Sequence, residues 1–576
     1  LQPELAAAAR DDDELAPVGR LDVVGKLAAS TIAYYKELPV ALRTPDSERN
    51  HVLASVRLGS VLESQSKMEE ATAVTANAAR IVTELRTKGD SSDATLMAHA
   101  STLMVQGRIL QGKSDWTPSV SKYAAALEIL KPLAARPDSP KKAAMLQARA
   151  LLGLGYSQIR MPGAAGDQNL RDAQQNLTRS MEIARGMNAL ELTNLPATEI
   201  YLSSGTWLSN AIYNQGKEAE TLKLAKEMIA LAERVLKLRP DFRPAIRASA
   251  TIAGDIASID YDNGRVAAAL KHFQEQAGAQ QKLVALDLSN TAEWNNLAVA
   301  KTLVSQAMRD LGRVDESMAT MREILSMADK FKVSPFTARN FGMWSGQLAM
   351  AYQNMGDAGQ AQWALAQRKK FAAMGRSGGE TDVLLEVGNM AFDARVLQIA
   401  GKYSEALALS KQGLAKAGTA KGDLGRGWRQ GLQETISRAA YATGDWASAE
   451  ESMRKEMTFR KEDLNDGIPS QFIYHDTAAR LARTLARQGK LSEAQELMKP
   501  ALQFATRKGV ELIEDNEQIV GRCNIFLAAA MADPAQRAAL LDKGAALFAS
   551  LPPAIKRWRS FAEIGEEIDR ERKKKI

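Results

Sequence analysis

One stretch of the sequence satisfies a phosphate-binding motif. Gly107, Gly112, Lys113 and Ser114 have the spacing G-x4-G-K-S, in which backbone amides and a lysine surround phosphate groups. Such a loop works only between a strand and a helix, because that geometry makes the backbone donors converge. Here residues 95–106 have the pattern of a helix, and Gly-Lys also occurs at three other turns. We therefore interpret 107–114 as a helix end and a turn, and keep a nucleotide-binding enzyme as a second alternative.

The other residues that could carry chemistry are scattered. His51, His99, His272 and His475 lack the spacing of metal ligands, and each is interpreted as a packing or surface residue. Cys523 is the only cysteine, which excludes an intrachain disulfide and a thiolate metal cluster and favours a place in helix packing. No G-x-S-x-G elbow stands in a strand context. We therefore predict that the chain is not an enzyme and carries neither a metal nor a cofactor.

A regular series of turns organises the chain around these residues. In residues 344–367, apolar positions at helical spacing flank Gly356-Asp357, which indicates two antiparallel helices joined by a tight turn. The same pattern recurs along the sequence, and residues 161–166 look like a loop insertion before its third occurrence. Aligned on the turn, the positions are Ser66, Ser114, Gln168, Gly216, Gly264, Gly312, Gly356, Gly401, Gly444, Gly489 and Asp533.

A small residue follows most of these turns at a fixed distance. Five residues after the turn stand Ala71, Ala173, Ala269, Ala361, Ala406, Ala449 and Ala494. In residues 344–367 the order is aromatic, Leu-small, Tyr, Gly-Asp, Ala, Leu, which resembles the signature of the tetratricopeptide repeat (TPR), whose small residues lie where paired helices touch. The resemblance covers nearly the whole chain. Extended repeats of this kind also resemble those of bacterial multidomain signalling proteins, where a kinase, winged-helix or TIR effector precedes the array.

The resemblance predicts the fold class and the division of the chain. We expect an all-α fold, a right-handed α-solenoid of about eleven TPR-like helical hairpins with capping helices. Residues 1–20 form a linker, and residues 21–374 form the N-terminal array. A Gly-rich hinge at 375–382 separates this array from a C-terminal array at 383–551. Residues 552–576 form a charged C-terminal capping helix.

The composition agrees with a helical protein and limits the classes of partner that it could bind. The chain has 75 basic and 68 acidic side chains, a net charge of +7, without the concentrated basic and aromatic residues of a nucleic-acid binder. No run approaches roughly 18 apolar residues, so we expect no membrane span. The single cysteine favours the cytoplasm; a periplasmic location stays open if a missing N-terminal part carries a transmembrane helix. Because the sequence starts at Leu1 without Met, we expect a segment cut from a larger protein or one without its leader.

A row of arginines falls on the predicted inner face of the C-terminal array. In TPR proteins, as the resemblance implies, the position six residues before the turn glycine faces the groove. Three consecutive repeats have arginine there, and two further arginines occupy neighbouring groove positions: Arg395, Arg438, Arg483, Arg480 and Arg487. Guanidinium groups pair bidentately with carboxylates, which favours an acidic peptide or a C-terminal carboxylate as the partner. The alternative is a solvated face balanced by acids such as Glu434 and Asp476.

The same counting gives a second candidate patch in the middle of the chain. Trp207, Asn210, Tyr213 and Asn214 precede the turn at Gly216, and Tyr261 precedes the next one. Asparagine amides can hold a peptide backbone, and aromatic rings supply rigid contact area. The alternative is core packing, because the aromatic residues also fall at apolar helical spacing.

These observations favour one function class over two others. We expect non-catalytic recognition of a protein or peptide, with the array as the sensor or scaffold part of a larger bacterial signalling protein linked to an N-terminal effector domain. No nucleic acid is expected as a partner. The first alternative is a structural module for self-assembly, and the second is the nucleotide-binding enzyme considered above.

Overall fold

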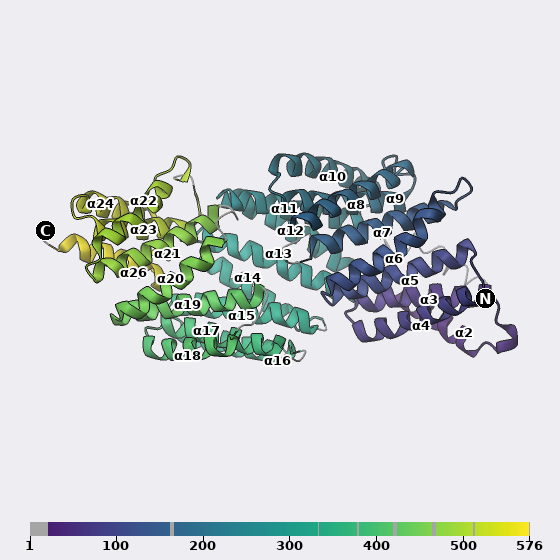
Figure 1. Ribbon diagram of the computed structural model, residues 1–576, viewed down its shortest axis with the longest axis horizontal. Helices are drawn as coiled ribbons and strands as arrows, with labels where there is room; N and C mark the ends of the chain where they lie inside the picture. The colour runs from purple at the N-terminus through teal and green to yellow at the C-terminus, as the bar shows by residue number, and fades with distance from the viewer. Residues whose placement is uncertain are drawn as a thin grey trace. The chain divides into compact units, whose positions relative to one another are not determined.

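The computed structural model describes residues 21–161, 166–331, 333–376, 380–418, 423–462, 468–510 and 513–574. Across these ranges the chain forms 25 α-helices, one 3-10 helix and no β-strand (Figure 1). Eleven consecutive helix pairs run from α3–α4 to α23–α24, with α2 before them and α25–α26 after them. The predicted all-α class and the predicted number of hairpins are confirmed. The right-handed sense of the solenoid stays a prediction.

The helices have the following bounds: α2 Leu21–Glu37, η2 Val40–Leu42, α3 Pro45–Ser64, α4 Met68–Thr87, α5 Asp93–Gly112, α6 Trp116–Ala134, α7 Lys141–Ile159, α8 Gly166–Gly186, α9 Leu195–Tyr213, α10 Glu218–Leu238, α11 Arg243–Asp262, α12 Val266–Leu286, α13 Thr291–Asp310, α14 Val314–Met327, α15 Pro335–Asn354, α16 Ala358–Met374, α17 Glu380–Ile399, α18 Tyr403–Ala417, α19 Asp423–Thr443, α20 Trp446–Glu462, α21 Ile468–Arg487, α22 Leu491–Ala505, α23 Asn516–Ala532, α24 Arg537–Ser550, α25 Pro553–Lys556 and α26 Arg559–Lys573. Among the described residues, none of these helices combines the length and the apolar character needed to cross a bilayer.

One residue with left-handed backbone closes each of nine hairpin turns. The amide of the following residue then returns to a carbonyl five residues back, as Lys67 N–H does to Leu62 O at 2.8 Å, which satisfies a helix-end carbonyl. Glycine adopts this backbone without strain from a Cβ atom, so it occupies most of these positions. The nine residues, all predicted as turns, are Ser66, Ser114, Gly216, Gly264, Gly312, Gly356, Gly401, Gly444 and Gly489.

One predicted turn position is wrong, and a second turn lies where it was predicted but has a different backbone conformation. Gln168 lies inside α8, so the third turn comes earlier than the alignment placed it; residues 162–165 lie outside the described residues. Asp533 ends α23 with φ −121°, an extended conformation, and its carboxylate accepts a hydrogen bond from the backbone amide of Ala535. A side-chain turn replaces the left-handed residue there, because aspartate can bond its own backbone two residues on.

Small residues mark the lines along which paired helices touch. All seven alanines five residues after a turn are fully buried, with 0% of their surface exposed. Glycines on the facing helices are equally constrained: a Cβ atom on Gly59 would lie 2.5 Å from Thr75 Cγ2, and one on Gly155 would lie 2.7 Å from Leu177 Cγ. Helix pairs therefore approach too closely for larger side chains at these positions, as the repeat pattern predicts.

The stretch with the phosphate-binding spacing is part of a hairpin. Gly107 and Gly112 lie in α5, which is followed by a turn at Ser114, and no strand precedes it in the described residues. A Cβ atom on Gly107 would lie 2.7 Å from Tyr123 Cε2, so this glycine serves close helix packing. Lys113 Nζ donates to Thr72 Oγ1 at 3.1 Å. The interpretation of 107–114 as a helix end and a turn is confirmed.

The chain divides into two compact units, which are described separately. Unit 1 holds Leu1–Ile256 and His272–Ala300, and unit 2 holds Ala257–Lys271 and Lys301–Ile576. The predicted arrays at 21–374 and 383–551, with a hinge at 375–382, stay a prediction; residues 377–379 lie outside the described residues.

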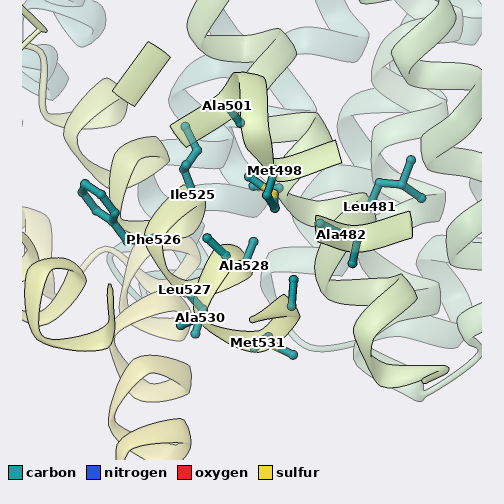
Figure 2. Packing of buried hydrophobic residues seen from close by; sticks show 14 of the residues in the cluster. Leu481, Ala482, Met498, Ala501, Ile525, Phe526, Leu527, Ala528, Ala530 and Met531 are labelled. Carbon is teal, nitrogen blue, oxygen red and sulfur yellow. The ribbon is translucent and has the colours of Figure 1, made fainter. Parts of the chain in front are cut away.

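Helix α23 forms the centre of the C-terminal core in unit 2. Fourteen of its 17 residues are buried, because α21, α22, α24 and α26 all pack against it. Figure 2 shows Ile525, Phe526 and Leu527 of this helix among side chains of α21 and α22. Cys523 is fully buried in the same cluster, which confirms its predicted place in helix packing, and burial raises the pKa of its thiol to about 12.

Within each unit, hairpins that are far apart in sequence touch. In unit 1, Ser66 Oγ lies 2.6 Å from Thr291 Oγ1, so the α3–α4 turn meets the start of α13. In unit 2, Asn516 Nδ2 donates to Asp310 O at 2.7 Å, which joins the start of α23 to the end of α13. The first helices of the intervening hairpins are thereby gathered around an interior in each unit.

Candidate partner-binding site

Unit 2 encloses a cavity of about 900 Å³. Its walls come from α13, α15, α17, α19, α21 and α23, which are first helices of their hairpins, and from α25 and α26 of the C-terminal segment. This volume falls in the range of pockets that hold drug-sized molecules. Four arginines of the predicted row lie in its wall: Arg395, Arg438, Arg480 and Arg483. The fifth, Arg487, follows Arg483 on α21.

Glu434 forms the centre of the basic wall. Its carboxylate accepts a hydrogen bond from Arg438 Nε at 2.9 Å and lies 3.2 Å from an Arg395 nitrogen and 3.9 Å from one of Arg460. Burial opposes the charge on this carboxyl, but the surrounding arginines outweigh it and hold the pKa of Glu434 below its ordinary value. One carboxylate is thus shared by three guanidinium groups.

Arg480 is committed to internal contacts. One of its nitrogens donates to Glu456 Oε1 at 2.6 Å, and Nε donates to Asp476 Oδ2 at 3.3 Å. The Arg480 side chain is 8% exposed and that of Glu456 is fully buried. Removing either partner would leave an uncompensated buried charge, so Arg480 has a structural role in this wall.

Arg483 and Arg487 face the C-terminal helix. Arg483 forms an ion pair with Glu567 of α26, and its guanidinium lies 4.8 Å from the centre of the Tyr441 ring. Arg487 donates to Glu567 at 2.9 Å and to Glu571 at 3.0 Å. An acidic helix therefore meets the predicted basic row, and that helix belongs to the chain itself.

Arg395 and Arg438 remain the least neutralised members of the row. Their side chains are 21% and 27% exposed, and both rely on the shared Glu434. Arg395 Nη1 is buried and has no hydrogen-bond partner among the described residues. Burial also lowers the pKa of the Arg395 guanidinium, which means that its charge is poorly compensated. An added carboxylate would find its best partners at these two residues.

The facing wall of the cavity is acidic. Asp310 accepts hydrogen bonds from Tyr261 Oη at 2.7 Å and from Arg309 at 2.9 Å. Asp515 caps α23 by accepting from the Glu517 amide at 2.8 Å, and burial raises the pKa of its carboxyl to about 7. Tyr261, predicted as part of the central patch, lies in this wall of unit 2.

The other four residues of the predicted central patch lie in unit 1. The ring centres of Trp207 and Tyr156 are 4.5 Å apart, and Trp207 packs beside the core. Asn210 Nδ2 donates to Asp255 Oδ1 at 3.1 Å, and Asn214 Nδ2 donates to Asn210 O at 2.8 Å. Tyr213 is half-buried at the end of α9. The structure brings Trp207 and Asn210 together on α9, with Asn214 directly after this helix, whereas Tyr261 belongs to the other unit.

Burial raises the pKa of the Asp255 carboxyl in this patch to about 7. Its Oδ2 atom is buried without a hydrogen-bond partner among the described residues. The sequence pattern gave no sign that this acid would be buried. The α9 patch is therefore a polar network between neighbouring first helices, with Asn210 as the donor to a poorly solvated acid.

The histidines lie apart from one another in the structure. His51 stacks on Tyr35 with ring centres 6.1 Å apart, and His475 stacks on Phe504 at 4.6 Å. Burial lowers the pKa of His475 to about 4. Within the described residues, no group of three or more acidic, histidine or cysteine side chains is placed to hold a metal ion.

The hairpin that carries Arg480, Arg483 and Arg487 has a recognisable sequence. Residues 476–508, from α21 and α22, match the family model of the tetratricopeptide repeat. Residues 476–508 are therefore a tetratricopeptide repeat. The matched TPR is the one whose first helix supplies much of the basic wall, and its turn at Gly489 has the same left-handed backbone as eight other hairpins.

Three solved structures illustrate what this chain is similar to. A Rap protein complexed with competence and sporulation factor is 12% identical, covers 72% of this chain and 98% of its own, and has a TM-score of 0.41. Yeast Tom70 is 13% identical, with 99% and 97% covered and a TM-score of 0.35. The hetero-tetramer Cut9–Hcn1 of the APC/C is 12% identical, with 98% and 94% covered and a TM-score of 0.35. No curated protein matches the sequence.

The carboxylates of α26 and the acidic wall were missed at the sequence level. Glu563, Glu567 and Glu571 recur at intervals of four, which would place them on one helix face. That spacing was the available signal. It did not indicate which repeats the helix would contact, because Glu567 lies 84 residues from Arg483 in sequence.

Proposed function

We propose that this TPR chain is a non-catalytic recognition module that binds an acidic protein or peptide segment in the interior of unit 2. The observation that carries the proposal is the sharing of Glu434 by Arg395, Arg438 and Arg460 in the wall of a cavity of about 900 Å³. A carboxylate on the partner, from a side chain or a chain end, would form charge-assisted hydrogen bonds with Arg395 and Arg438. Their helices are already positioned, so little ordering opposes binding.

We infer further that the module is the sensor or scaffold part of a larger signalling protein, with an effector domain on the same chain. This inference rests on the resemblance of the extended repeats to bacterial multidomain arrays. The partner's engagement in unit 2 would then be the event that the effector responds to. The α9 patch in unit 1, with Trp207 and Asn210, is proposed as a second contact region for the same partner's backbone.

Binding of a defined peptide tests the proposal. The probe is a fluorescein-labelled helical peptide with glutamate at every fourth position, and its matched control carries glutamine instead. We expect the glutamate peptide to bind the full chain, and the double variant Arg395→Gln/Arg438→Gln to weaken binding roughly tenfold or more, since each charge-assisted bond is worth more than ~1 kcal/mol. Affinity is read from fluorescence anisotropy.

Arg313→Gln supplies the control variant for this experiment. Arg313 is an exposed arginine of unit 2 that pairs with Glu316 three residues on and takes no part in the cavity wall. Its replacement should leave peptide affinity unchanged. Equal binding of the glutamate and glutamine peptides, or equal binding to wild type and the double variant, would overturn the proposed function.

A further inference from the structure

The C-terminal segment runs along the interior of unit 2. Ile555 and Trp558 are buried against Val314 and Val520, which places α25 between the α13–α14 region and α23. The Ser560 amide donates to Asn354 Oδ1 at 3.1 Å, at the end of α15. The segment thus touches hairpins from α13 to α23 and covers part of the same inner surface that holds the arginine row.

Helix α26 presents carboxylates to that row at regular intervals. Glu567 contacts Arg483 and Arg487, and Glu571 contacts Arg487. One turn earlier, Glu563 lines the same cavity as Arg395 and Arg438. Residues four apart lie on one face of a helix, so α26 carries an acidic stripe matched to the basic one.

A side of α26 that adjoins the acidic stripe is apolar. Ile568 is buried in the C-terminal core, and Ile564 packs beside that core. The helix is therefore amphipathic, with one face that fills a hydrophobic surface of α23 and α24 and another that neutralises arginines. A helix laid into a groove by an apolar face is a common form of peptide recognition.

We propose that the interior of unit 2 accepts an amphipathic partner helix with carboxylates at four-residue intervals, and that α26 is a built-in competitor for that surface. The inference rests on the proposed function, because it names the chemistry of the segment that Arg395 and Arg438 bind. Glu563 is the competitor's carboxylate nearest to these arginines. A carboxylate of the partner helix would replace Glu563 in the cavity. The contacts that Glu567 and Glu571 make with the arginines would then weaken as well.

Exchange of one acidic helix for another is compatible with the energetics of buried ion pairs. Loss of α26 without replacement would remove the carboxylate that pairs with Arg483 and would expose the apolar surface that Ile564 and Ile568 cover, which is unfavourable. A partner that brings its own carboxylates avoids this loss, so release of α26 is coupled to arrival of the partner. The apparent affinity for the partner is then lowered by the fraction of molecules whose interior is covered.

Hydrogen exchange on the full chain tests the competition directly. The probe is the glutamate peptide described above, added at saturation, and the readout is the exchange rate of backbone amides measured by mass spectrometry. We expect amides of residues 559–573 to exchange at least several-fold faster when the peptide is bound. Amides of α16 should be unaffected, because that helix lies in unit 2 but outside the cavity wall.

A pair of variants on α26 gives a second, independent measurement. Glu563→Gln removes the carboxylate nearest to Arg395 and Arg438 without unpairing a buried arginine, and it should raise peptide affinity about threefold to tenfold. Asp569→Asn changes an exposed acid of the same helix outside the cavity wall and should have no effect. Both variants keep the contacts of Glu567, so both are expected to fold.

The outcomes separate this inference from the proposed function. One outcome would overturn the competition and leave the proposed function standing. In it, peptide binding depends on Arg395 and Arg438, the amides of α26 exchange equally slowly with and without peptide, and Glu563→Gln and Asp569→Asn bind the peptide with the same affinity. Absence of peptide binding to wild type and to Glu563→Gln would overturn both. Peptide-induced dimers would identify an exchange of α26 between two copies of the chain and would also overturn a separate partner helix.

Discussion

The two units are built from the same helical hairpin but treat the charges of their interiors differently. In unit 1, Arg108 pairs with Glu63 at 3.0 Å and Arg247 pairs with Glu293, and these arginine side chains are 44% and 46% exposed. In unit 2, the side chains of Arg480 and Arg483 are only 8% and 7% exposed. Arg483 owes its cover in part to α26. The comparison teaches that the repeat places arginines on an inner face. The exposed fraction of one of them, Arg483, depends in addition on α26, a segment outside the repeats.

The largest difference between the units should appear when one carboxylate is removed from each. Glu567→Gln in unit 2 leaves buried Arg483 without its carboxylate and should lower the free energy of unfolding by about 3–5 kcal/mol. Glu63→Gln in unit 1 leaves the half-exposed Arg108 to water and should cost less than about 1 kcal/mol. Urea unfolding followed by circular dichroism measures both. Similar losses for the two variants would show that the interiors are electrostatically alike.

A second pair of variants should make the units behave alike. Burial raises the pKa of Asp255 in unit 1 and of Asp515 in unit 2 to about 7, from an ordinary value of 3.8. Folding stability from such an acid is fully present below pH about 4 and is lost as pH rises to 7, because the folded state disfavours the charged form. Asp255→Asn and Asp515→Asn should therefore each gain about 4 kcal/mol of folding stability relative to wild type between pH 4 and pH 8, since the shift of about 3 pKa units is worth ~1.4 kcal/mol per unit.

Thermal or urea unfolding across that pH range measures this gain. Asparagine keeps an acceptor oxygen for the cap of α23 at position 515, so the cap itself should survive. If the difference in unfolding free energy between a variant and wild type does not change with pH, the corresponding carboxyl is charged over the whole range. The two units would then differ at this feature as well.

The smallest expected effects concern the hairpin turns. Ser114 in unit 1 has φ 63° and Gly444 in unit 2 has φ 79°, so the same backbone is held by a strained residue in one unit and an unstrained one in the other. Ser114→Gly should stabilise the chain, and Gly444→Ala should destabilise it, each by about 1 kcal/mol. Calorimetric midpoints compared with wild type give the sign. Two changes of the same sign would mean that side-chain contacts, rather than backbone strain, govern these turns.

Much of the fold was accessible from sequence because its determinants are local. A glycine at the turn and an alanine five residues later report backbone conformation and close helix contact, and both repeat along the chain. The local pattern fails at two positions: Gln168, where an inserted loop misplaced the predicted turn, and Asp533, where a side-chain turn replaces the left-handed residue.

The candidate site was only partly accessible for the opposite reason. Counting from the turns located Arg395 and Arg438 in the wall of the unit 2 cavity. The burial of Arg480 by Glu456 and the return of α26 onto Arg483 depend on contacts between distant segments. Charge and spacing in the sequence do not distinguish an arginine that is available to a binding partner from one that is already paired with a carboxylate of the same chain.

The contact between Asn516 and Asp310 has a consequence for the rate at which a partner arrives. This hydrogen bond joins segments 206 residues apart and forms part of the wall around the unit 2 interior. A polypeptide that enters such an interior does so more readily by a free end than by a loop in the middle of a folded domain. Tails and terminal helices of a partner would therefore associate rapidly, whereas internal segments would associate only after the wall has opened.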